Sequence, residues 1–303
     1  MFSRRHPYLF FMLIFASVVS FSIVMISAAL LIGSKRSDYV GYHMGREKVG
    51  IIELVGIISE SRAIIEKIKR FRDDDTVKAI VLRIDSPGGS VGPSQEIFRE
   101  VRKTVEKKKV IASMGSVAAS GGYYVAAGAD GIIANPGTIT GSIGVMMGFT
   151  NFQKILEKAG LVSVVVKSCE YKDIGSPTRE MTDKEADILQ NVADRIHNQF
   201  IDAIASGRNM DKDKVASFAN GRIFSGEEAK ELGLVDRLGN LEDAVEWAGR
   251  MAGIKGDISS VYIEDTKISL LKYIAESSLK HLVYRIIYPS LSADYMYQPD
   301  SQR

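Results

Sequence analysis

The chain has 303 residues, of which 46% are hydrophobic and 25% are charged, and its formal net charge at pH 7 is +2. The net charge is close to zero and the basic residues form no stripe, unlike in nucleic-acid-binding proteins. We therefore expect no nucleic-acid partner. The lone Cys169 excludes an intramolecular disulfide, and four scattered histidines lack metal-ligand spacing, so we expect no metal and no cofactor.

The first element expected along the chain is a membrane-spanning helix. No charged residue occurs from Tyr8 to Ile32, and at about 1.5 Å per residue this stretch is longer than the roughly 30 Å hydrocarbon layer of a bilayer. It lacks the short apolar core and the A-x-A-like exit of a cleaved signal peptide. Arg4 and Arg5 precede the span while Lys35 and Arg36 follow it, so the positive-inside rule favours a cytoplasmic amino terminus by a small margin.

The sequence divides into four expected regions. They are a cytoplasmic tip with a transmembrane signal anchor at 1–36, a polar linker at 37–48, a globular domain at 49–255, and a carboxyl-terminal segment with a tail at 256–303. Apolar residues from Ile268 to Ile287 follow helical spacing, which suits a membrane surface, a neighbouring subunit or the chain's own domain. The tail from Ser290 is expected to be flexible.

Strand-like and helix-like runs alternate through the globular region. Val49–Ile58 and Ala79–Ile84 predict strands, and the apolar residues between them, from Ile64 to Phe71, follow helical spacing. Further strands are expected at Val110–Met114, Gly131–Ala134, Thr140–Met147 and Leu161–Lys167, and further helices from Pro93 and from Tyr123. Such alternation predicts an α/β fold of stacked units with a mostly parallel sheet.

Capping boxes mark two helices in the carboxyl half. Thr182–Glu185 opens a long helix whose apolar stripe, from Leu189 to Ile204, we expect to pack in the core. Ser225–Glu228 opens another helix, which ends near Gly233. The next helix carries Trp247, the only tryptophan, for which burial is a sufficient explanation.

The run from Gly115 to Tyr124 sets the hydroxyl of Ser120 among very small residues. Because a strand is expected before it and a helix after it, Ser120 would lie near a strand-to-helix turn. There the N–H groups of Gly121 and Gly122 are free, and the helix dipole favours developing negative charge. This suits a nucleophile, although close packing of a helix against a sheet explains the small residues equally well.

A second informative stretch, Asp85–Ser90, follows the strand that ends at Ile84. Pro87 bars a continuing central strand, and the paired glycines after it let the backbone adopt positive φ and aim N–H groups at a ligand. Neither GxGxxG nor GxxxxGK[ST] occurs, so we do not expect nucleotide binding. An ordinary turn between a strand and a helix is the alternative for this loop.

If Ser120 attacks an acyl carbon, a general base must accept its proton. No histidine lies in these motifs. A lysine can serve if it is uncharged, which requires desolvation that lowers its pKa from about 10.4 by roughly three units. Lys172, in the loop Glu170–Pro177, is the best of several candidates, because the other lysines mostly mark helix faces or ends.

The motifs that carry chemistry occur in one order along the chain. They are Ser120–Tyr124, Thr140–Val145, Tyr171–Asp173 with Ser176–Pro177, and Gly221–Phe224 with Gly233–Asp236. Together they resemble the signal peptide peptidase A (SppA) family, peptidase family S49, whose members are membrane-anchored serine proteases of the ClpP/crotonase superfamily. The resemblance covers roughly residues 49–249. It implies a ClpP/crotonase-like fold of stacked ββα units, with residues 49–255 as the protease domain.

By this resemblance Ser120 is the nucleophile, Lys172 is the general base and Ser142 helps to orient the lysine. The loop that contains Gly89 resembles the oxyanion loop of the superfamily, so the N–H groups of Gly89 and Gly121 would stabilise the tetrahedral oxygen. The implied reaction is acyl transfer in two steps, in which the acyl-enzyme is hydrolysed by a water that Lys172 activates.

The implied function is that of a membrane-anchored serine endopeptidase with a Ser/Lys dyad, which degrades remnant signal peptides or other hydrophobic peptides. Family members with one catalytic copy per chain form ring-shaped homo-oligomers, with an octamer as one candidate size, in which neighbouring subunits can supply the two residues of one dyad. The resemblance also implies a single-pass protein of the inner (plasma) membrane with an extracytoplasmic catalytic domain. A crotonase-like acyl-CoA enzyme and a catalytically inert membrane scaffold are the alternatives.

Overall fold

The computed structural model describes residues 47–263 and 294–296, together with Tyr8, Phe15, Ser17, Ser20 and Phe21. The chain divides into two compact units, residues 1–46 and residues 47–303. Apart from those five residues, the expected membrane span lies outside the described residues, as does the amphipathic segment 268–287. Within the described part, no helix combines the length and the apolarity that crossing a bilayer requires.

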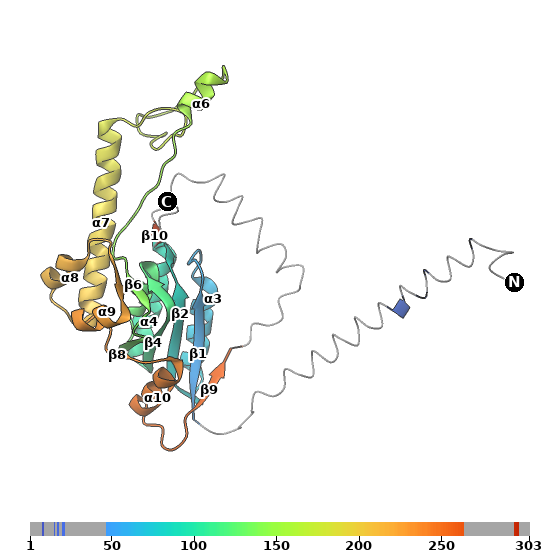
Figure 1. The fold of residues 1–303 in the computed structure, drawn as a ribbon, viewed down its shortest axis with the longest axis vertical. Helices are drawn as coiled ribbons and strands as arrows, with labels where there is room; N and C mark the ends of the chain where they lie inside the picture. The colour runs from blue at the N-terminus through green and yellow to red at the C-terminus, as the bar shows by residue number, and fades with distance from the viewer. Residues whose placement is uncertain are drawn as a thin grey trace. The chain divides into compact units, whose positions relative to one another are not determined.

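The second unit is built on an eight-stranded sheet in which β7, β6, β4, β2, β1 and β9 lie in that order, and β5 and β8 continue from β4 (Figure 1). The neighbouring strands are parallel, except that β6 and β7 are antiparallel. The strands are β1 Lys48–Val55, β2 Val77–Ser86, β4 Lys109–Ala119, β5 Gly131–Ala134, β6 Ile139–Gly141, β7 Ile223–Ser225, β8 Arg237–Leu238 and β9 Ser259–Tyr262. The predicted α/β fold with a mostly parallel sheet is confirmed.

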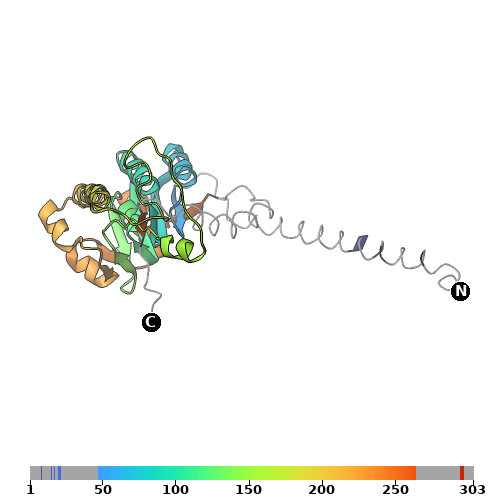
Figure 2. The same cartoon turned by 90° about the horizontal axis from the view of Figure 1, so that it is seen from above.

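Helices cover both faces of this sheet. On one face α3 and α4 lie side by side (Figure 2), and their apolar residues pack on Ile80, Leu82 and other inward-facing strand residues. On the other face α10 packs against Val81 and Ile111, because successive strand residues point to opposite faces. The helices are α3 Arg62–Asp73, α4 Val91–Val105, α5 Gly121–Ala126, α6 Gln153–Lys158, α7 Asp183–Arg208, α8 Lys212–Phe218, α9 Gly226–Leu232 and α10 Leu241–Met251.

Strand β4 divides its pairing between two neighbours on the side away from β2. Its first part, Ile111–Ser113, pairs with β5, and its last part, Val117–Ala119, pairs with β6. The carboxyl ends of β2, β4 and β6 therefore meet at one edge of the sheet, with Ser120 directly after β4. Next to this edge β3, Gly88–Ser90, pairs with β10, Asp294–Met296, in a separate two-stranded sheet.

Two strand predictions are wrong, and each has a local cause. The strand expected at Thr140–Met147 ends at Gly141, because Ser142 has a φ of +50° and turns the chain. Leu161–Lys167 is a loop rather than a strand. Although β-branched, it pairs with none of the described strands, and Val164 and Val166 are 83% and 96% exposed.

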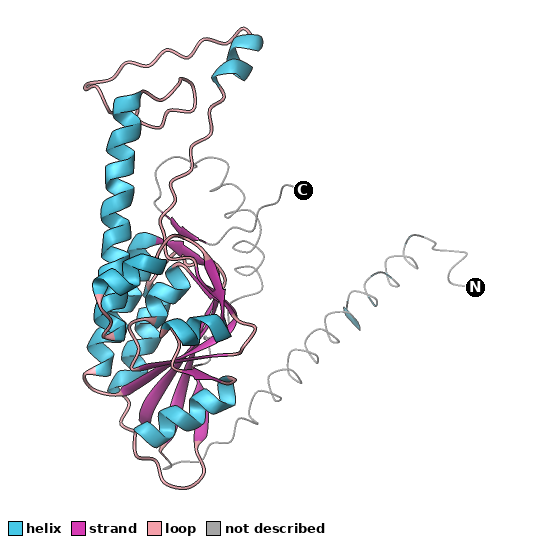
Figure 3. Ribbon diagram, turned by 60° about the vertical axis from the view of Figure 1, so that its left-hand side comes forward, coloured by secondary structure: helices cyan, strands magenta, loops and turns pink. Residues whose placement is uncertain are grey.

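Helix α7 joins the core only through its carboxyl-terminal half. Phe200 and Ile204 are buried, whereas Val192 is 42% exposed, so the prediction that the whole apolar stripe packs in the core is wrong. Both capping boxes are confirmed, at Thr182 before α7 and at Ser225 before α9. We call residues 149–192 the arm: it consists of α6, its flanking loops and the start of α7, at the end of α7 away from the sheet (Figure 3).

Candidate active site

Ser120 lies between β4 and α5 in a backbone conformation that an L-residue rarely adopts. Its φ is +53° and its ψ is −117°. Two hydrogen bonds hold this turn: the Ser120 N–H donates to the Gly141 carbonyl at 2.8 Å, and the Ser120 carbonyl accepts from the Tyr124 N–H at 2.8 Å. Positive φ at such a residue costs about 1–3 kcal/mol and persists where the surroundings enforce it, as at many functional sites. The turn thus fixes the position of one hydroxyl.

Gly121, which follows Ser120 directly, lies close to Gly89 of the glycine loop. A Cβ atom on Gly121 would come within 3.2 Å of the Gly89 nitrogen and 2.6 Å of the Ser94 Oγ, so the two glycine backbones are close neighbours. A Cβ atom on Gly89 would lie 2.3 Å from the Ile58 carbonyl oxygen. A side chain at either position would displace a neighbouring atom, so the close approach of the two backbones depends on both residues being glycine.

Ser142 lies next to Ser120 across the sheet edge. Ser142 follows Gly141, whose carbonyl accepts the Ser120 N–H, and its own N–H donates to the Arg222 carbonyl at 2.8 Å. It is 8% exposed, and like Ser120 it has positive φ. The structure therefore brings together four of the five site residues expected from the sequence.

Lys172, the fifth, lies in the arm, and its side chain is exposed. The neighbouring Asp173 accepts hydrogen bonds from Arg179 Nε at 2.8 Å and from Lys167 Nζ at 2.6 Å. Arg179 also donates to Glu185 Oε2 at 2.8 Å, in the first turn of α7. This network ties the loop that carries Lys172 to the start of α7.

Within one copy of the chain, Lys172 does not lie beside Ser120. The lysine loop is fixed at Glu185, whereas the Phe200 ring of α7 packs on Tyr124, with ring centroids 4.8 Å apart, one turn of α5 from Ser120. Positions 185 and 200 are about 22 Å apart along a helix that rises 1.5 Å per residue. A lysine side chain cannot cover that separation.

The Arg179 network has a clear dependence on pH. The Arg179 guanidinium and the Thr182 N–H lower the pKa of Glu185 to about 2, and Arg179 with Lys167 holds the pKa of Asp173 well below its usual range. Because both values are lowered, the network is complete above the ordinary carboxyl pKa of about 4 and is lost as the pH falls toward 2. The lysine loop is therefore anchored at neutral pH.

Two positioning residues escaped the sequence analysis. The Asp85 carboxylate, at the start of the glycine loop, accepts the Val117 N–H at 3.1 Å and ties β2 to the end of β4. Ser94 is fully buried against Gly121, and its hydroxyl donates to the Ser90 carbonyl at 2.9 Å. Asp85 was noted only as the first residue of the glycine loop and Ser94 lies outside the motifs, because each acts through contacts that only the folded chain creates.

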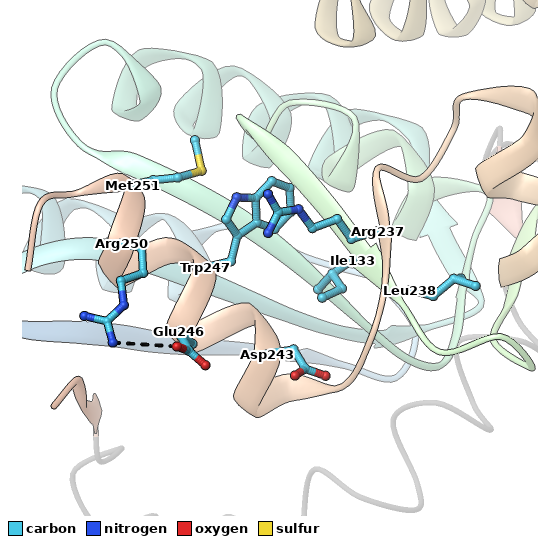
Figure 4. Close-up of a pocket in the computed structure, with 8 residues that line it drawn as sticks. All are labelled: Ile133, Arg237, Leu238, Asp243, Glu246, Trp247, Arg250 and Met251. Atoms are coloured by element: carbon cyan, nitrogen blue, oxygen red, sulfur yellow. Dashed lines mark ion pairs between the residues drawn. The ribbon is translucent and has the colours of Figure 1, made fainter. Parts of the chain in front are cut away.

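A separate open cleft of about 590 Å³ lies between α10 and the strands β5 and β8 (Figure 4). Its wall is formed by the Arg237 guanidinium stacked over the Trp247 ring at 4.2 Å, and by an ion pair between Arg250 and Glu246 at 3.6 Å. Trp247 is only partly buried, which corrects the expectation of simple burial. None of the lining residues is one of the five predicted site residues, so this cleft is not the candidate active site.

Comparison with known proteins identifies similar proteases. The family model described as peptidase family S49 matches residues 102–255, and the model described as Clp protease matches residues 44–140. A protein of Synechocystis sp. named as a protease is 47% identical over 224 residues, which cover 73% of this chain and 81% of that protein. A protein of Enterococcus faecium named as a signal peptide peptidase is 38% identical over 183 residues, which cover 60% and 53%.

A third relative, the chloroplastic serine protease SPPA of Arabidopsis thaliana, is 36% identical over 229 residues, which cover 71% of this chain and 34% of the relative. Ser120 lies inside both family matches, Gly89 inside the Clp protease match and Lys172 inside the S49 match. The S49 match alone spans half of the chain, and the Synechocystis relative is matched over most of its length. The chain belongs to peptidase family S49, the signal peptide peptidase A family of serine proteases.

Proposed function

We propose that this protein is a membrane-anchored endopeptidase in which Ser120 of one copy and Lys172 of an adjacent copy form a Ser/Lys dyad. Ser120 attacks the peptide carbonyl, the N–H groups of Gly89 and Gly121 stabilise the oxyanion, and Ser142 orients the lysine. Lys172 takes the hydroxyl proton and then activates the water that hydrolyses the acyl-enzyme.

The observation that carries this proposal is that four of the five expected site residues lie together in one copy and the fifth, Lys172, does not. Ser120, the two glycine N–H groups and Ser142 are within one sheet edge, but Lys172 is held at the far end of α7. In the described part of a single copy this lysine is exposed to water. A second copy that buries the arm would both deliver the amine and desolvate it.

The arm exposes apolar side chains of the kind that subunit interfaces bury. Val162, Val164 and Val166 are 86%, 83% and 96% exposed, and Ile155 on α6 is 64% exposed. Contiguous exposed apolar residues in a folded domain mark a surface that binds something. We assign that role to the adjacent subunit, since the loop between these valines and α7 carries Lys172. Repeating one such contact around an axis builds a closed ring.

The substrate class and the location follow from the family and the amino terminus. The name of one relative, a signal peptide peptidase, supports our proposal that the substrates are hydrophobic peptides, in particular remnant signal peptides. The anchor at residues 1–36 would hold the protease domain, residues 49–255, close to the inner membrane on its extracytoplasmic side. Membership of a peptidase family argues against the acyl-CoA enzyme and the inert scaffold.

Replacing Val164 with aspartate is expected to prevent assembly and to lower peptide hydrolysis about 10²- to 10⁴-fold, the usual contribution of a general base. The side chain is 83% exposed in one copy, so folding should be unaffected. Light scattering after size exclusion measures the assembly, and circular dichroism measures the fold. Met251→Asp, at another exposed apolar side chain, is the matched control and should assemble and hydrolyse normally. A Val164→Asp protein that is monomeric yet fully active would contradict the shared site.

A further inference from the structure

Arg179, in the arm, connects two acidic residues, and one of them follows Lys172 directly. Its Nε and Nη2 atoms donate to the two carboxylate oxygens of Asp173, at 2.8 and 2.9 Å. Its Nη1 atom donates to Glu185 Oε2 at 2.8 Å, and Nη2 also donates to the other carboxylate oxygen of Glu185. One guanidinium therefore holds both the lysine loop and the first turn of α7. Arg179 is not among the five site residues expected from the sequence.

The two carboxylates that Arg179 joins are shielded from water. The Glu185 side chain is 4% exposed and the Asp173 side chain is 14% exposed. Carboxylates buried to this extent need a partner, and the planar fork of a guanidinium can donate to both oxygens of a carboxylate, which an ammonium cannot match. Glu185 also accepts the Thr182 N–H at 2.9 Å in the capping box, so its position is fixed on the helix. Through Arg179, α7 therefore sets the position of Asp173.

The backbone next to Lys172 is held by the same group of contacts. The Asp173 carbonyl accepts Arg179 Nη2 at 3.2 Å and the Ser176 N–H at 3.0 Å. On the other side of the loop, the Lys172 N–H donates to the Cys169 carbonyl at 3.3 Å. Because the Lys172 side chain itself is exposed, the place from which its amine can reach a partner is set by this backbone.

The placement of a general base decides how well it works. The base must come within about 2.6–3.2 Å of the group whose proton it takes. A displacement of about 1 Å, caused by a change away from the chemistry, can cost about 10²-fold in rate. A loop that carries the base to another copy must therefore keep its shape across the contact.

We propose that Arg179 is a positioning residue for the general base. Its bridge between Asp173 and Glu185 fixes the loop so that the Lys172 amine reaches the hydroxyl of Ser120. Arg179 then acts in the copy that donates the lysine and has no part in the serine site of its own chain. This inference rests on the proposed function of Lys172 and adds a residue that the reaction needs although it does not touch the substrate.

Arg179→Lys in the full chain tests the bridge, because lysine keeps the charge but cannot bind both carboxylates in this planar geometry. For a hydrophobic peptide we expect kcat to fall about 10- to 100-fold, with KM within about twofold of the parent value, since the serine site is unchanged. Arg195→Lys, the same change at an exposed arginine of α7, is the matched control and should keep the parent kcat. A kcat of Arg179→Lys within about twofold of the parent, or a loss confined to KM, would overturn the proposal.

Mixed assemblies show in which copy Arg179 acts. Mixed in equal amounts with Ser120→Ala chains, Arg179→Lys chains supply intact serines and the Ser120→Ala chains supply intact lysine loops. About a quarter of the parent activity should then appear. Mixed with Lys172→Ala chains, they should show no more activity than Arg179→Lys alone, because no chain has an intact lysine loop. General damage to the fold would prevent recovery in both mixtures.

A mixture of Ser120→Ala with Lys172→Ala is the reference for this experiment. When the reference mixture is active, recovery with Lys172→Ala, or no recovery with Ser120→Ala, would overturn the role of Arg179 and leave the dyad intact. A silent reference mixture would instead overturn the shared site of the proposed function. The kcat of Arg179→Lys alone then decides whether Arg179 positions the lysine.

Discussion

Ser120→Ala is expected to lower peptide hydrolysis by about 10⁴-fold or more, the scale seen when the nucleophile of a serine protease is removed. The loss is this large because no acyl-enzyme can form, while the N–H groups of Gly89 and Gly121 retain only residual transition-state stabilisation. The variant should also lose labelling by a fluorophosphonate, which reacts with an activated serine. Initial rates and mass spectrometry of the labelled protein measure the two effects.

The control for this prediction is Ser116→Ala, the same change four residues upstream in β4. Ser116 is exposed, whereas Ser120 is buried in the strand-to-helix turn. Ser116→Ala should keep full activity and full labelling, and both variants should unfold at the parent temperature, since the backbone hydrogen bonds that hold the turn at Ser120 do not involve either hydroxyl. Full activity in Ser120→Ala would remove this residue from the mechanism.

Lys172→Ala is expected to lower hydrolysis about 10²- to 10⁴-fold, and Lys172→Arg should be equally impaired. The arginine variant is informative because a guanidinium keeps the positive charge but stays protonated at any working pH, so it cannot accept the Ser120 proton. Measurement of kcat for assembled protein tests both variants. Lys154→Ala, at an exposed lysine of α6 in the same arm, is the matched control and should be fully active.

The two lysine variants distinguish a base from a mere countercharge. If Lys172 only stabilised negative charge or the arm itself, arginine would restore most of the activity that alanine loses. The anchoring contacts of the loop come from Asp173, Arg179 and Glu185, so both variants should keep the arm folded. An active Lys172→Arg enzyme would therefore assign the general base to another group.

Local signals in the sequence were sufficient to predict the elements that position the nucleophile. The strand before Ser120, the helix after it and the glycine loop at Asp85–Ser90 each have a signature within a few residues. The same holds for α7 and α9, whose capping boxes satisfy N–H groups at the helix start. These features depend on neighbours in sequence and need no knowledge of the fold.

Features that depend on distant partners could not be predicted in this way. Leu161–Lys167 has the composition of a buried strand, but no described strand lies beside it, and its valines face water in a single copy. The apolar stripe of α7 is continuous in sequence. Only the carboxyl-terminal half of the helix packs on the domain, so Val192 lies outside the core. Both errors arise because composition and spacing do not say which apolar residues the rest of the fold will cover.

The site itself was predictable only in part, for the same reason. Ser120, Gly89 and Ser142 come together because β2, β4 and β6 are parallel and their carboxyl ends meet at one edge. The positive φ of Ser120 and the pairing of β10 with β3 leave no trace in composition or periodicity. The role of Lys172 came from family resemblance, and its separation from Ser120 in one copy came from the fold.

Mixing two inactive proteins tests whether the serine and the lysine of one site belong to different copies. Ser120→Ala and Lys172→Ala chains are combined in equal amounts, dissociated, reassembled and assayed. Random assembly should restore about a quarter of the sites, because half of the serine positions and half of the lysine positions are intact across each heterologous contact. Activity near this level is the result we predict. Mixed assemblies with no activity above that of the separate variants would show that one site does not draw its serine and lysine from different copies.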